Sequence, residues 1–131
     1  MRKKIFLAGV IVFILWSVLG FMMHGLILKS AYASTASLWR PMAEMKMGLM
    51  YVSVFIAALS FSAIYGYLVA KKSLMAGLTY GLLYGIAVGV GMGYGSYSMM
   101  PIPYGMALTW FLGTVIEGVL GGLLLGAIIK K

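Results

Sequence analysis

The sequence GLTYGLLYGIAVGVGMG, residues 77–93, decides the fold of this chain because glycine recurs in it at every fourth position. These glycines, which we call the glycine ladder, are Gly77, Gly81, Gly85, Gly89 and Gly93. Residues four apart share one face of a helix, so the ladder is a stripe without side chains. At about 1.5 Å per residue it spans about 24 Å of a hydrocarbon core roughly 30 Å thick. Because such stripes let helix backbones approach closely, the pattern predicts a tightly packed transmembrane helix.

The composition agrees with a membrane protein. Of the 131 residues, 63% are hydrophobic and 9% are charged, and the mean hydropathy is +1.06, which excludes an ordinary soluble domain. The chain has no cysteine, so disulfides, thiolate metal sites and thiol catalysis are excluded. The net charge is +8, but the basic residues lie at the ends of apolar segments, and we expect no nucleic-acid partner.

Four apolar segments predict an all-α integral membrane protein with four transmembrane helices. The helices form a compact bundle of two antiparallel hairpins with glycine-rich packing, and residues 1–131 make one domain. The predicted segments are about residues 4–28, 46–70, 74–97 and 104–129, with an outer connection at about residues 29–45.

Positive charge is distributed unequally between the two sides of the predicted bundle. The basic residues on one side are Arg2, Lys3, Lys4, Lys71, Lys72, Lys130 and Lys131, and those on the other are Lys29, Arg40 and Lys46. By the positive-inside rule this asymmetry predicts that both termini are cytoplasmic. We therefore expect a multi-pass protein of the inner (cytoplasmic) membrane of a cell.

Two further segments carry rows of small residues. The second segment has Ala58, Ser62, Gly66 and Ala70, and the fourth has Thr114, Gly118, Gly122 and Gly126. We expect the row of the second segment to pack against the glycine ladder, since residues 71–73 form only a short turn between these segments. The first segment has fewer small residues and is expected at the periphery, outside a centre formed by the other three.

The two outer connections contain apolar residues where water is expected. Tyr32 and Trp39 of the first connection are typical of the aromatic belt at a membrane interface. The second connection, at about residues 96–104, has no charge and includes Ile102 between two prolines. We expect it either to enter the interface or to be covered.

Glu117 is the only acidic residue within a predicted membrane segment. If the helices cross straight, the residues at its depth are Trp16, Ser17, Ser60 and Tyr84, and no cation shares this layer. One interpretation makes Glu117 a proton or cation carrier. The other makes it a protonated hydrogen-bonding clasp between helices, and we favour the clasp because nothing else lines a path.

His24 and the methionines of the outer half form a second candidate site. The residues are Met22, Met23, His24, Met42, Met45 and Met47. Thioethers with one imidazole suit Cu(I), but methionine also fills cores and adaptable docking surfaces. We favour packing or docking, commit to no metal or cofactor, and expect His24 to bond Tyr51 or Thr109.

The residues present no catalytic set and no phosphate-binding loop. We therefore expect a non-catalytic membrane protein that lies in the lipid bilayer and packs as a subunit or scaffold in a homo-oligomer or with other membrane protein subunits. The alternative is a small proton, cation or Cu(I) transporter that uses Glu117 and an outer methionine and histidine entry site.

Overall fold

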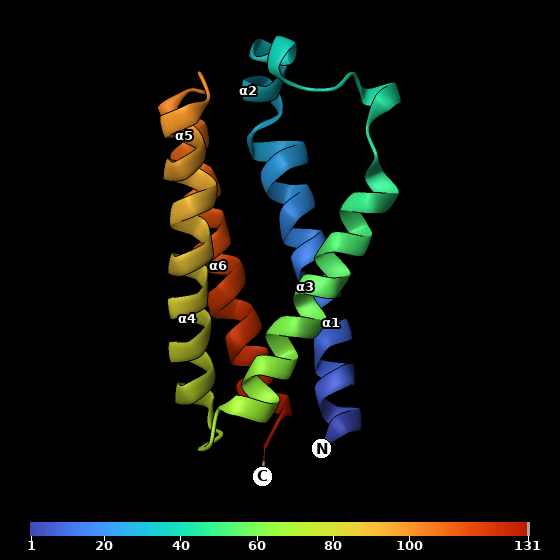
Figure 1. Cartoon of the computed structure of the whole chain (residues 1–131), viewed down its shortest axis with the longest axis vertical. Coiled ribbons are helices and arrows are strands. Elements are labelled where there is room, and N and C mark those ends of the chain that lie inside the picture. The colour runs from blue at the N-terminus through green and yellow to red at the C-terminus, as the bar shows by residue number, and fades with distance from the viewer. Residues whose placement is uncertain (131) are drawn as a thin grey trace.

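The computed structural model describes residues 1–130, and these are helical apart from short connections (Figure 1). Four helices are long and apolar enough to cross a membrane. They are Arg2–Ile27, Met47–Leu68, Leu74–Met99 and Tyr104–Ile128. The prediction of an all-helical chain with four such helices is therefore confirmed.

Two of the long helices change their winding along their length. The first comprises α1 (Arg2–Gly20) and a π-helical segment (Phe21–Ile27), and the short helix α2 (Lys29–Ser34) follows it. The third comprises α4 (Leu74–Val90), a π-helical segment (Gly91–Gly95) and α5 (Ser96–Met99). Both π-helical segments contain glycine, whose weak preference for the α-helix allows a wider turn. The other long helices are α3 (Met47–Leu68) and α6 (Tyr104–Ile128).

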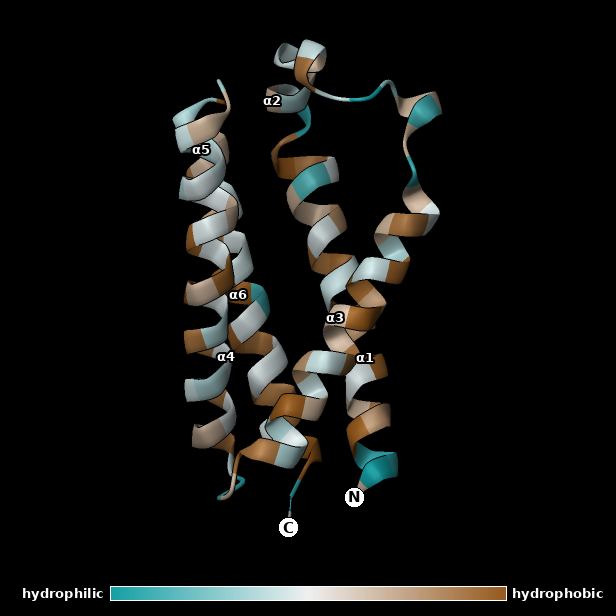
Figure 2. Ribbon diagram, viewed as in Figure 1, coloured by the Kyte–Doolittle hydropathy of each residue, from teal (hydrophilic) through white to brown (hydrophobic). Residues whose placement is uncertain are grey.

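The four long helices form two pairs (Figure 1). In one pair, α4 and α6 run side by side. In the other, α3 crosses α1, and α1 also contacts α6 and so joins the pairs. Both termini and the turn between α3 and α4 lie at one end, which we call the terminal end, and the remaining connections lie at the opposite loop end. Hydrophilic residues gather at these two ends (Figure 2).

The first segment does not lie at the periphery, so that prediction is wrong. Ile5, Ala8, Val12 and Trp16 of α1 are buried in the main hydrophobic cluster, together with residues of α3 and α6. A Cβ added to Gly9 would lie 3.2 Å from the Cα of the facing Leu59. Small residues at the crossing point are thus enough to bring α3 against α1, although α1 has no long glycine row.

A second hydrophobic cluster closes the loop end. Ile102 in the uncharged connection before α6 is 4% exposed, and Tyr32 and Trp39 of the first connection pack against the cluster that contains it. The expectation of cover holds for Ile102, whose cluster is contacted by residues of the first connection, whereas Met99, Pro101 and Pro103 are exposed.

Candidate functional site

The glycine ladder packs against α6, backbone to backbone. A Cβ added to Gly85 would lie 2.8 Å from the Cα of Val115, and one added to Gly81 would overlap the carbonyl oxygen of Gly118. A Cβ on Gly118 would in turn lie 2.9 Å from the Cα of Gly85. The same kind of contact joins Gly77, Gly89 and Gly93 to α6, and Gly122 and Gly126 to the first half of α4 and its N-cap. The close approach predicted by the small-residue pattern therefore occurs within one chain.

Ser62 and Gly66 face α1, so the prediction that their row packs on the ladder is wrong. The Ser62 hydroxyl donates to the carbonyl oxygen of Ile5 at 2.6 Å, and the Ile5 side chain fills the space beside Gly66. Contact between α3 and α4 is made by rings, since those of Phe61 and Tyr80 lie 4.7 Å apart. These rings hold the two backbones apart, whereas α6 offers a row bare enough for the ladder.

Glu117 lies in the middle of α6 beside Trp16 and Tyr84. The indole nitrogen of Trp16 donates to the main-chain carbonyl of Glu117 at 2.8 Å, and the Trp16 ring stacks on the Tyr84 ring with centroids 6.1 Å apart. Glu117 is half-buried, yet its carboxyl group has no hydrogen-bond partner among residues 1–130. The indole thus fixes the α6 backbone and leaves the carboxyl group free.

The other two residues of the predicted layer do not bond Glu117. Ser60 is exposed on α3, and the buried hydroxyl of Ser17 has no partner within the described part of the chain. The prediction assumed four straight helices, in which residues of equal depth meet. Because α3 crosses α1 obliquely (Figure 1), residues of equal depth on these helices face different neighbours.

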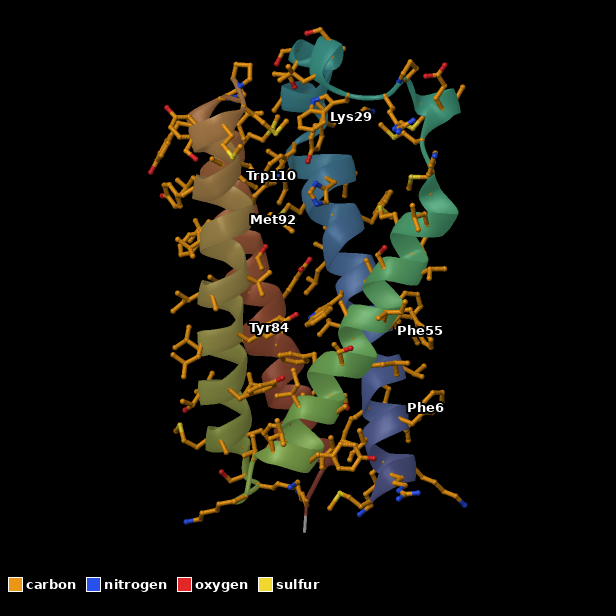
Figure 3. All side chains as sticks on the ribbon, viewed as in Figure 1. Phe6, Lys29, Phe55, Tyr84, Met92 and Trp110 are labelled. Carbon is orange, nitrogen blue, oxygen red and sulfur yellow. The ribbon has the colours of Figure 1, made fainter. Side chains whose placement is uncertain are left out.

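An aromatic cluster adjoins Glu117 and ties the two helix pairs together. The Phe61 ring of α3 lies 5.0 Å from Trp16 of α1 and 4.6 Å from Tyr84 of α4. The Tyr80 hydroxyl donates to the carbonyl oxygen of Phe61 at 2.7 Å. Figure 3 shows Tyr84 between α4 and the crossing pair. Edge and stacked contacts of this kind stabilise a packed centre and also present ring faces to a cation.

Tyr32 organises the loop end through its hydroxyl group. The indole nitrogen of Trp110 donates to this hydroxyl at 2.8 Å, and Nδ1 of His24 lies 2.5 Å from it. Since an indole only donates, the hydroxyl accepts from Trp110, and it shares a second hydrogen bond with Nδ1 of His24. The prediction that His24 bonds Tyr51 or Thr109 is therefore wrong.

Replacing Tyr32 with phenylalanine is expected to change the alkaline stability of the protein. Burial raises the pKa of the Tyr32 hydroxyl, and the hydrogen bond from Trp110 partly opposes this shift. A raised pKa in the folded state stabilises the fold below the unfolded pKa of about 10, and this contribution is lost as the pH rises through the folded value. The midpoint of unfolding should be measured in detergent at one pH below and one pH above about 10. Between these two pH values the midpoint should fall less for Tyr32→Phe than for the unsubstituted protein.

Near neutral pH the same substitution should cost about 1–2 kcal/mol, because the Trp110 indole loses its acceptor. Tyr67, which is 60% exposed on α3, provides the control Tyr67→Phe. If the two variants behave alike at both pH values, the Tyr32 hydrogen bonds contribute nothing to stability.

The structure does not gather the methionines around His24. Met23 is buried in the loop-end cluster, and Met22 is 46% exposed. The methionines at positions 42, 45 and 47 are all exposed, by 80%, 38% and 43%. The segment Met42–Glu44 lies beyond the loop end of α3, apart from α1 and α2 (Figure 1). These six side chains therefore form no single set of ligands in the described chain.

Sequence reasoning missed the two residues that complete these sites. Trp110 lies near the start of α6, where tryptophan is common because it sits at the membrane interface. Its position in the sequence therefore gave no sign that it bonds Tyr32. Phe61 appeared as one more apolar residue in a uniformly apolar helix. Protein-family models, curated proteins and solved structures offer no match to this chain, so its function has to be inferred from this geometry alone.

Proposed function

We propose that the chain is a non-catalytic subunit or scaffold of a membrane complex, either a homo-oligomer or a larger assembly, which binds neighbouring helices by packing. The proposal places it in the inner membrane with both termini cytoplasmic. Basic residues support this orientation, since Arg2, Lys3, Lys4, Lys71, Lys72 and Lys130 stand in or beside elements at the terminal end.

The main support for this proposal is the exposure of the loop-end half of α3. Every residue from Met47 to Ser53 is exposed, whereas the terminal-end half of the same helix buries Phe61 and Tyr65 completely. A Cβ added to Gly48 would meet nothing within 4 Å, so this position is open to a close approach. Methionine at positions 47 and 50 adds adaptable apolar surface. The glycine ladder is occupied by α6, whereas this part of α3 is open to a neighbour.

The mass of the native particle in nanodiscs tests the subunit proposal. The particle should contain several copies of the chain or a second protein, and Gly48→Leu should reduce that assembly. Gly91→Leu is the matched control, because Gly91 also has open space around it but lies in the π-helical segment that follows α4. A particle that holds a single chain, or equal loss of assembly in both variants, would count against the proposal.

A second candidate function is transport of a proton or a small cation. It is supported by the free carboxyl group of Glu117 in the middle of α6 and by the rings of Trp16 and Tyr84 beside it. An ionisable group at membrane depth is often functional, and ring faces attract cations. The Cu(I) variant of this idea has less support, because the methionines at positions 42–47 lie apart from His24.

Flux into liposomes that contain only this chain separates the two functions. A carrier should move protons or a small cation, and Glu117→Gln should abolish the flux. The chain has one other acidic residue, Glu44, so Glu44→Gln is the control and should keep full activity. If the liposomes show no flux above protein-free vesicles, the carrier function is rejected and the subunit proposal stands.

A further inference from the structure

Two hollows meet at the terminal end of the α4 and α6 pair. One has a volume of about 420 Å³ and is lined by Lys72, Ser73 and Lys130 with a few small or apolar neighbours. The other has a volume of about 440 Å³ and is lined by apolar residues alone, mainly leucines of α6 with Leu15 of α1. Both hollows are lined by Leu74 and Ala127, so a basic hollow continues into an apolar groove.

The two lysines of the basic hollow come from different segments and have no acidic side chain near them. Lys72 is half-buried, and its ammonium group donates to the carbonyl oxygen of Val69 at 2.8 Å, which leaves two further N–H donors. The only acidic residues are Glu44 and Glu117. Glu44 lies at the loop end, and Glu117 is thirteen residues from Lys130, about 20 Å along a helix.

We propose that this composite hollow binds a phospholipid with an anionic headgroup from the leaflet at the terminal end. The phosphate lies between Lys72 and Lys130, and an acyl chain lies in the groove lined by Leu120, Leu123 and Leu124. Basic pockets between transmembrane helices bind anionic lipid headgroups in other membrane proteins. A soluble phosphate would satisfy the lysines but would leave the adjoining apolar groove without an occupant, and we therefore assign a lipid.

Helix α4 supports the headgroup position, since its first turn lies at the same hollow. The Ser73 hydroxyl accepts a hydrogen bond from the backbone N–H of Ala76 at 3.0 Å and caps the helix. The positive end of the α4 dipole therefore points toward the place where the phosphate lies. This contribution adds to that of the lysines, which carry the full charges.

Native mass spectrometry of the detergent-solubilised full chain tests the inference with two lipids of equal acyl length. Phosphatidylglycerol should be retained more than phosphatidylcholine, and Lys72→Gln with Lys130→Gln should remove this preference. Each lysine should account for roughly a fivefold change in relative affinity. The variant Lys29→Gln with Lys46→Gln removes the same charge at the loop end and should keep the preference.

Two further measurements keep the test decisive. Lys72→Arg with Lys130→Arg preserves charge and should retain the preference, which separates a binding role from a folding role. Glycerol 3-phosphate carries a phosphate group on glycerol but has no acyl chains. It should not compete with phosphatidylglycerol at equal concentration. The inference is overturned if both lipids bind equally, if the loop-end control loses as much selectivity, or if glycerol 3-phosphate competes fully.

Discussion

Gly81→Ala is expected to lower the free energy of unfolding by about 3 kcal/mol, the upper end of the usual range for overpacked sites. The added methyl group would overlap the carbonyl oxygen of Gly118. Backbone atoms cannot rotate away as a flexible side chain can, so α4 and α6 would have to separate. The measurement is a titration with sodium dodecyl sulfate of protein in mild detergent, followed by circular dichroism.

Gly91→Ala on the same long helix is the matched control. A Cβ at Gly91 or at Gly95 would meet nothing within 4 Å, and alanine is favoured over glycine in a helix by about 1 kcal/mol. The same chemical change should therefore be neutral or slightly stabilising at Gly91 and strongly destabilising at Gly81. Equal effects at the two positions would mean that the backbone contact between α4 and α6 is absent.

Phe61→Ala should have the second largest effect, a loss of about 3–5 kcal/mol. The Phe61 side chain is fully buried, with 0% exposure, and its ring touches Trp16, Tyr80 and Tyr84. Removing the ring leaves a cavity where α1, α3 and α4 meet, and the surrounding rings cannot all collapse into it. The loss should appear in the same unfolding titration and as a weaker near-ultraviolet circular dichroism signal.

Phe6→Ala is the comparison for this variant, because Phe6 is 59% exposed and lies on α1 (Figure 3). It should change the unfolding free energy by less than about 1 kcal/mol, as is usual for surface positions. If Phe6→Ala proves as destabilising as Phe61→Ala, the aromatic cluster does not hold the two helix pairs together.

The positions of the long helices could be predicted from the sequence, but their partners could not. Apolar length and the charged ends determine where a helix starts and stops, and both are local properties. Pairing depends on which surfaces fit. The short turn after the second segment favoured the row that contains Ser62 and Gly66 as the partner of the ladder, whereas the structure pairs the ladder with the row that contains Gly118 and Gly122. The choice depends on the rings of Phe61 and Tyr80, which separate α3 from α4.

The candidate site was predictable only in part, for a related reason. Trp16, Glu117 and Tyr84 share a depth in the membrane, and depth can be counted along a sequence. The bond from the Trp16 indole to a main-chain carbonyl has no sequence pattern, since every residue offers a carbonyl. The crossing angle of α3 removed Ser60 from the layer, and no count of residues gives that angle.

The bonds that join α1 and α2 to α6 set an order of events during synthesis. The Trp16 bond spans 101 residues, and the bond between Trp110 and Tyr32 spans 78. At about 5–20 residues per second, α6 leaves the ribosome roughly 5 to 20 s after α1. During that interval the Trp16 indole and the Tyr32 hydroxyl have no partner from α6. Closure of the bundle therefore waits for α6, and a nascent chain stalled before α6 would lack both bonds.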